Sequence, residues 1–243
     1  MPRTLPSWSD GPTRDAIIAT NHTLLRKGSA RRPTLPDSVT VNEPVFIEEG
    51  TTIERSTIDG NTAGNVGGGL RSLGNVTLTN STLSGNTSLA WYGGAIFHTD
   101  GVLQLVHSTV AHNTAPDFGS AAIFVGTFTS AGATLRLRSS IVADNTGGCF
   151  AGFFGAGPVV LASDGNNLGS DGSCNLTAAG DRPNTPAGLG PLASNGGPTA
   201  THALLAGSAA IDAAGLSCPA VDQRGVARPQ GPACDAGAFE RTP

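Results

Sequence analysis

A short internal repeat is the feature that most constrains the fold of this chain. Four segments align on one pattern, a Ser followed by a short alternating stretch and then an Asn: Ser56–Asn61, Ser81–Asn86, Ser108–Asn113 and Ser140–Asn145. The asparagines that close these segments are separated by 25, 27 and 32 residues. Units of this length with tight-turn residues hold two or three short strands and no helix, so they predict a solenoid.

A second element of the repeat has the alternation of a β-strand. It precedes the last three segments and places one polar residue between two apolar ones: Val76–Leu78, Leu103–Leu105 and Leu135–Leu137. The apolar residues would face one side of the strand. One unit cannot bury that side alone, whereas units stacked about 4.8 Å apart bury a continuous column. We therefore expect an all-β, right-handed parallel β-helix of some five or six coils, its hand following that of parallel crossovers.

The repeat assigns roles to individual residues. One apolar residue per copy would point into the column: Ile58, Leu83, Val110 and Val142. Gly-Gly pairs at 67–68 and 93–94 would allow a corner that a Cβ would obstruct. One asparagine per copy would stand at a turn: Asn61, Asn86, Asn113 and Asn145. Asn tolerates the left-handed region and can bond to the Asn of the next coil, so we expect a stacked ladder, with four separate turn residues as the alternative.

Composition excludes several classes of protein. Charged residues make up 13% of the chain and the formal net charge is −4, so neither a nucleic-acid binder nor a helical bundle is expected. No apolar run reaches the ~18 residues that a membrane span needs. Hydrophobic residues still make up 38%, which supports a packed core rather than a disordered chain.

The two ends depart from the repeat and divide the chain into residues 1–36, 37–193 and 194–243. In the first region, Arg14–Asn21 has helical composition with Thr13 as N-cap, so we expect a short N-terminal helix or loop over the first coil. The last region concentrates charge in an otherwise nearly neutral chain, at Asp212, Asp222, Arg224, Arg228, Asp235 and Glu240. We expect an irregular, ion-paired cap that covers the open strand edges at the other end; the alternative is a functional site.

Four cysteines complete the framework. Their even number and loop-length gaps fit two disulfides formed in an oxidising compartment. Pairing neighbours in sequence gives Cys149–Cys174 and Cys218–Cys234, while four reduced thiols are the alternative. The first residues, 1–6, contain no apolar core of a signal peptide. The chain then either lacks its true N-terminus or is exported by another route.

The C-terminal region carries motifs that resemble those of bacterial choice-of-anchor Q domain proteins. These motifs are NGGPTATHALL at 195–205, GSAAIDA at 207–213, DQRGVARP at 222–229 and CDAGAFE at 234–240. The stretch TRDAIIATN at 13–21 also resembles the usual opening of that family, without its preceding Cys, and residues 26–55 fit the family poorly. The resemblance implies a secreted or surface-anchored right-handed β-helix. The family is defined by architecture and attachment, so the resemblance implies no particular reaction.

The histidines fit structural positions. His107 aligns with Asn80 and Ser139 and would replace a polar corner residue. His202 belongs to a C-terminal motif and would pack or form hydrogen bonds. The alternative is that His98 and His112, on adjacent coils, form a proton-transfer pair.

An enzyme that acts on polysaccharides is the main alternative function, because many β-helices have that activity. A hydrolase needs two or three carboxylates about 5–10 Å apart, and a lyase needs a cation and a base. The outward positions of neighbouring coils contain no such cluster. Arg136 and Arg138 could bind an anionic sugar, although two arginines on a solvent face usually serve solubility. The acidic stretch 164–171 lacks the spacing of a calcium loop, so we expect no metal and no cofactor.

We therefore expect a non-catalytic extracellular or cell-surface module for adhesion or glycan binding. The insert at 88–92, with Trp91 and Tyr92, and the loops around Phe118 and Phe128 would form the contact surface. The expected partner is a surface glycan or a protein of a host or neighbouring cell, and the expected state is a monomer. A lyase or glycoside hydrolase and a fragment of a larger surface protein remain the alternatives.

Overall fold

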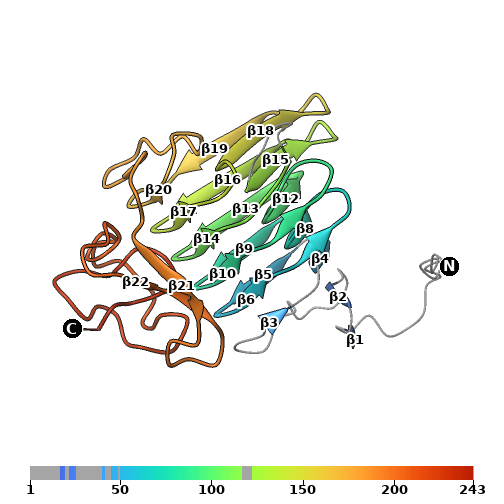
Figure 1. Cartoon of the computed structure of the whole chain (residues 1–243). Coiled ribbons are helices and arrows are strands. Elements are labelled where there is room, and N and C mark those ends of the chain that lie inside the picture. The colour runs from blue at the N-terminus through green and yellow to red at the C-terminus, as the bar shows by residue number, and fades with distance from the viewer. Residues whose placement is uncertain are drawn as a thin grey trace.

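The computed structural model describes residues 17–19, 22–25, 40–41, 45–48, 50–116 and 122–242. Within these residues the chain forms strands and turns and no helix. Parallel strands stack on one another as a β-solenoid, and the chain climbs one coil at a time from β4 to β20 (Figure 1). The predicted fold class, a parallel β-helix, is confirmed.

Each coil contributes one strand to each of three sheets. The first sheet contains β4 (Val45–Glu48), β8 (Leu70–Leu73), β12 (Ile96–Thr99), β15 (Ile123–Thr127) and β18 (Cys149–Phe153). The second contains β5 (Thr51–Glu54), β9 (Val76–Thr79), β13 (Gly101–Val106), β16 (Ala133–Arg138) and β19 (Val159–Ser163). The third contains β3 (Thr40–Val41), β6 (Thr57–Asp59), β10 (Thr82–Ser84), β14 (Thr109–Ala111), β17 (Ile141–Ala143) and β20 (Leu168–Gly169). The short strands β7 (Thr62–Ala63) and β11 (Thr87–Ser88) pair in parallel beside them.

The register of these sheets explains the core. Leu83 lies opposite Ile58 on one neighbouring strand and opposite Val110 on the other, and Val110 lies opposite Val142. All four side chains are buried. In the second sheet the apolar pairs Val76/Leu78, Leu103/Leu105 and Leu135/Leu137 point inward, and the residue between the members of each pair points outward, as the alternation predicts. One apolar column therefore runs through the solenoid.

The four repeat asparagines form a ladder along the axis of the solenoid. Asn61 donates to Asn86, Asn86 to Asn113 and Asn113 to Asn145, each through its amide nitrogen to the next amide oxygen, at 2.8, 2.8 and 2.9 Å. The same oxygens accept the backbone N–H groups of the residues below. The ladder therefore satisfies buried backbone donors at a corner where no strand pairs.

The left-handed corner lies one residue earlier than the sequence suggested. Positive φ angles occur at Gly60, Gly85, His112 and Asp144, each just before a ladder asparagine, and not at the asparagines themselves. The asparagines are needed for their side-chain amides, while the preceding residue makes the turn. The Gly-Gly corners follow expectation. A Cβ at Gly68 would lie 2.2 Å from the carbonyl oxygen of Gly94, so the stacked backbones leave no room for one.

A second ladder lies at the other corner and was not predicted. Three backbone N–H groups donate to the serine hydroxyl on the next coil at 3.2–3.3 Å: Ser56 to Ser81, Ser81 to Ser108, and Ser108 to Ser140. The residue before the serine turns the chain: φ is 46° at Asn80, 45° at His107 and 49° at Ser139. His107 thus occupies the predicted corner.

The N-terminal segment differs from the prediction. Ile17–Ala19, within the stretch expected to be helical, forms strand β1, which pairs antiparallel with β2 (His22–Leu25). Strand β2 in turn pairs in parallel with β4. A strand satisfies backbone groups along a sheet edge, which a helix placed over the coil would leave unpaired. Residues 13–16, 20 and 21 of the expected helix lie outside the described residues.

The last coil is covered by residues 171–186. Cys174 and Leu176 pack into the apolar column, and Cys149 forms a disulfide with Cys174. The backbone of Arg182 bonds to Asn167 and Gly169 on either side of Leu168, which extends the third sheet by a partial rung. This segment therefore covers the end of the solenoid that follows β20. The charged C-terminal region, which we expected to cover that end, does not.

The C-terminal region lies along the side of the solenoid, against the outer face of the third sheet (orange and red in Figure 1). It begins with the antiparallel pair β21 (Leu189–Ala193) and β22 (Thr201–Leu204), so the expected boundary at 193/194 falls inside a hairpin. It also contains the Cys218–Cys234 disulfide. Three outward threonines of the third sheet bond to this region: Thr57 to the carbonyl of Ala200, Thr82 to Gln223, and Thr109 to the N–H of Ala238. Farther along the sheet, Ile141 and Ala143 pack against apolar residues of the same region. A sheet covered on both faces explains why its strands are wholly buried.

The asparagine ladder yields a stability prediction. Asn86→Ala removes the acceptor of Asn61 and the donor to the carbonyl of Ile58, so buried backbone groups lose their partners. We expect the free energy of unfolding to fall by about 2–4 kcal/mol in urea titrations. Thr177→Ala, at an exposed polar side chain, is the control and should cost less than about 1 kcal/mol. Equal costs in the two variants would contradict a structural ladder.

Candidate functional site

An aromatic row runs across the outer face of the first sheet. Phe97 on β12 lies opposite Phe124 on β15, which lies opposite Phe150 on β18. On the neighbouring coil below, the same position holds Arg71. Phe97 and Phe124 stack with ring centroids 4.7 Å apart and planes 7° apart. The row follows from the register, because equivalent positions of successive coils meet side by side.

One wall beside this row comes from the insert at 88–92. Tyr92 stacks on Phe150, with centroids 5.5 Å apart and planes 5° apart, and contacts Phe124 at 4.7 Å. Trp91 lies 6.4 Å from Tyr92 and remains 52% exposed. The backbone N–H of Trp91 donates to the carbonyl of Asn65 on the coil below at 3.0 Å, which fixes the insert. The sequence prediction that the insert protrudes with an exposed tryptophan is confirmed.

The opposite wall comes from the loops that follow β15 and β18. Phe128 and Phe154 stack with centroids 5.1 Å apart and planes 11° apart, and both rings are more than half exposed. The two loops are layered by backbone bonds from Phe154 to Thr127 and from Gly157 to Thr129. The expected contact loop at Phe128 is therefore present, whereas Phe118 lies outside the described residues.

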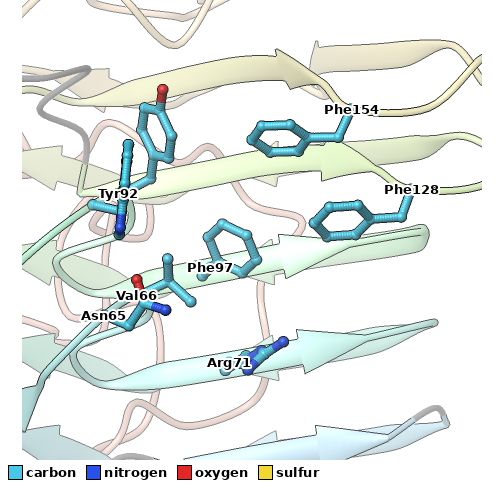
Figure 2. Close-up of a pocket in the computed structure, with 8 residues that line it drawn as sticks. Asn65, Val66, Arg71, Tyr92, Phe97, Phe128 and Phe154 are labelled. Carbon is cyan, nitrogen blue, oxygen red and sulfur yellow. The ribbon is translucent and has the colours of Figure 1, made fainter.

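Between these walls lies an open groove of about 350 Å³ (Figure 2). Figure 2 shows Tyr92 on one side, Phe128 and Phe154 on the other, Phe97 between them, and Arg71 one coil below. The groove is lined by eight residues: Asn65, Val66, Arg71, Trp91, Tyr92, Phe97, Phe128 and Phe154. Its volume lies in the range of small-ligand sites. Its lining is mainly apolar ring surface, with amide and guanidinium groups at one end, and contains no carboxylate.

The two arginines predicted as ligand-binding residues do not lie at this groove. Arg136 and Arg138 belong to β16 in the second sheet. The Nε of Arg136 donates to Asp164 at 3.0 Å, and a second nitrogen of the same guanidinium also bonds to that carboxylate. Arg136 is therefore paired within the chain. Arg136 and Arg138 therefore lie on another sheet than the groove, and outward positions of different sheets face different sides.

Sequence reasoning missed most of the aromatic site. Phe97, Phe124 and Phe150 each follow the inward residue of the first sheet: Ile96, Ile123 and Cys149. That repeated aromatic position was the available signal. The repeat pattern described above includes the Gly-Gly corners before this position and not the position itself. Phe154 could not be placed from sequence, because it follows β18, in a coil whose repeat is degenerate.

The charged cluster of the C-terminal region is an internal structural network. Arg228 bonds to Glu240 at 2.7 Å and Arg224 to Asp222 at 2.8 Å, and the side chains of both pairs are almost completely buried. The guanidinium of Arg224 also lies 3.6 Å from the centroid of the Phe239 ring. Burial raises the pKa of Asp235 and of Glu240, against the influence of Arg228. Since these groups bond to one another, they leave no open geometry for chemistry.

Three histidines are buried in neutral form. Burial lowers the pKa of His98 to about 4, and its Nδ1 lies 2.9 Å from the hydroxyl of Ser72 inside the column. Burial, with Arg228 and Arg138 nearby, lowers the pKa of His107 to about 3. Burial also lowers the pKa of His202, whose ring bonds to Ser84 and to the carbonyl of Gly190. His98 is bonded to Ser72 inside the column, so the alternative of a His98–His112 pair finds no support.

The residues that the structure describes contain no group of three or more His, Cys, Asp or Glu side chains placed to hold a metal ion. They also contain no helix of the length and hydrophobicity needed to cross a membrane. Both predicted disulfides are formed, and such bonds are typical of oxidising compartments. No protein-family model, curated protein or solved structure matches this chain.

The burial of His107 yields a pH prediction. Its folded-state pKa lies below the ordinary value of 6.5, so its neutral form contributes stability that is fully present above pH 6.5 and is lost as the pH falls toward 3. His107→Asn removes this titration and keeps a residue that tolerates the corner, as Asn80 does. We expect the pH slope of the unfolding free energy between pH 6.5 and 4 to fall by up to about 1.4 kcal/mol per pH unit.

Urea unfolding at pH 4.5, 5.5 and 7 measures this slope. His112→Asn is the matched control, because His112 also has a positive φ but lies exposed to solvent. An unchanged slope in His107→Asn would show that His107 does not titrate differently in the folded and unfolded states.

Proposed function

We propose that this protein is a non-catalytic extracellular or surface module that binds glycans in the aromatic groove. The observation that carries the proposal is the partly exposed aromatic lining: Trp91, Phe128 and Phe154 are 52%, 56% and 53% exposed around the buried Phe97. Large exposed rings on a soluble fold mark a binding surface, because their burial against a partner is favourable. Sugar rings have flat C–H faces that pack on aromatic rings and hydroxyls that stay hydrated.

A binding role is preferred to a catalytic one because of what lines the groove. Glycoside hydrolysis needs paired carboxylates, and the lining residues contain none. Asp100, the acidic residue near the Phe128 loop, already accepts hydrogen bonds from Thr127 and Thr129. A lyase needs a base beside its cationic group, and the eight residues that line the groove include no histidine, lysine or carboxylate.

The proposed location rests on the disulfides and on the sequence motifs. Two disulfides suit an oxidising environment. The resemblance of the C-terminal motifs to choice-of-anchor Q domain proteins supports secretion or surface attachment. A contact surface on a rigid solenoid fits a module that holds a ligand near a cell, whether a surface glycan or a glycosylated protein of a neighbouring cell.

A glycan array followed by calorimetric titration tests the proposal. We expect the protein to bind oligosaccharides with dissociation constants in the micromolar to millimolar range and to leave them intact in reducing-sugar and unsaturated-uronate assays. Trp91→Ala should weaken binding about tenfold or more, since truncating an anchoring aromatic typically costs more than about 1 kcal/mol. Leu216→Ala, at an exposed apolar residue of the C-terminal region, should leave binding unchanged.

Two results would contradict the proposal. Turnover of a polysaccharide would support the enzyme instead. Binding that is insensitive to Trp91→Ala would place the glycan elsewhere on the molecule.

A further inference from the structure

Asp100 lies beside the groove without lining it. It occupies the turn between β12 and β13, has a positive φ of 54° and is half-buried. Its neighbour on the next coil is the loop after β15, which carries Phe128. The carboxylate faces this loop rather than solvent alone.

The Asp100 carboxylate accepts several hydrogen bonds from that loop. One oxygen, Oδ1, accepts the hydroxyls of Thr127 and Thr129, each at 2.7 Å, and the backbone N–H of Thr129 at 3.3 Å. The other, Oδ2, accepts the backbone N–H of Phe128 at 3.4 Å. Hydrogen bonds to an ionised acceptor are stronger than neutral ones. Four donors from three consecutive residues fix the direction in which the Phe128 ring leaves the backbone.

The position of this loop matters for the groove. Phe128 is more than half exposed and has a stacking contact with Phe154, itself half exposed. The Phe128 ring therefore has few packing contacts that fix its orientation. Its orientation depends instead on how the backbone of the loop is held. The loop above follows it closely, since a Cβ at Gly155 would lie 2.7 Å from the carbonyl carbon of Phe128. A shift of Phe128 would therefore move the whole wall.

We propose that Asp100 is the positioning residue of the groove: its carboxylate clamps the loop 127–129 and so pre-forms the aromatic wall that the ligand meets. This inference rests on the proposed glycan-binding function and adds a residue that touches no ligand. Pre-forming the wall avoids the entropy cost of ordering it on binding, so the clamp acts on affinity.

The clamp depends on the charge of Asp100. Its partial burial raises the pKa, but the hydrogen bonds from Thr127, Thr129 and Phe128 outweigh this and lower the pKa below its ordinary value of 3.8. The ionised form, and with it the clamp, therefore persists throughout the neutral and mildly acidic range. It is lost only as the pH falls through the lowered value.

Asp100→Asn tests the clamp. Asparagine keeps one acceptor oxygen but presents an NH₂ donor toward the N–H of Phe128 in place of Oδ2. With cellohexaose as the probe, whose rings have equatorial hydroxyls and apolar faces, we expect affinity to fall about tenfold by Trp91 fluorescence in a Trp8→Phe background. Asp164→Asn makes the same chemical change at the Arg136 pair of the second sheet and should leave affinity unchanged. Equal affinity in wild type and Asp100→Asn would overturn the proposal.

A second measurement separates failure of the clamp from failure of the proposed function. In NMR spectra of the wild type, the amide signals of Phe128 and Thr129 should titrate with the same midpoint as the Asp100 carboxyl, below pH 3.8. If cellohexaose does not bind but the signals titrate together, the result supports the clamp and counts against the glycan proposal. If the signals do not follow Asp100, the clamp is wrong whatever binds. Thr129→Val, which removes one donor, serves if Asp100→Asn does not fold.

Discussion

The structure depends on backbone groups of each coil bonding to the coils on either side in a single register. That pairing has no partner within one coil, so a coil has no stability of its own and gains it by stacking. Once the register is set, equivalent positions must meet: Leu83 between Ile58 and Val110 inside, and Phe124 between Phe97 and Phe150 outside. The asparagine and serine ladders extend the same rule to the corners, where the strands end and backbone groups would otherwise be buried without partners.

The same rule builds the candidate site. An aromatic position repeated on three coils becomes a continuous row, and inserts that differ in length between coils become its walls. The site therefore requires no fold of its own; it requires only that Trp91, Tyr92, Phe128 and Phe154 lie on loops that flank the same sheet. Asp100 fits this scheme, since it links one coil's turn to the next coil's loop. The solenoid thus presents an apolar groove, on which the proposal of a binding role rests.

The sequence predicted the features that the repeat determines. It missed those that depend on contacts between segments far apart in the chain. Alternation around Leu78, Leu105 and Leu137 sufficed for the strands and the column, and the spacing of the asparagines sufficed for the ladder. The C-terminal region was misplaced because its contacts to Thr57, Thr82 and Thr109 join residues more than 120 positions apart, and a short polar side chain looks the same in sequence whether water or another segment covers it. That Arg136 and Arg138 lie on another sheet than the aromatic groove could not be predicted either, because the side that each sheet faces depends on the corners.

The most direct test of this account is whether the register between coils is the one described. In a Thr77→Cys/Gln104→Cys variant the two cysteines replace directly paired residues of β9 and β13, whose separation suits a disulfide. In a Thr77→Cys/Val102→Cys variant the second cysteine is displaced by two residues, which places the Cα atoms beyond about 7 Å. Mass spectrometry of the oxidised proteins should find the new cross-link in the first variant and not in the second. A cross-link in the second variant alone would contradict the register, and with it the aromatic row and the groove.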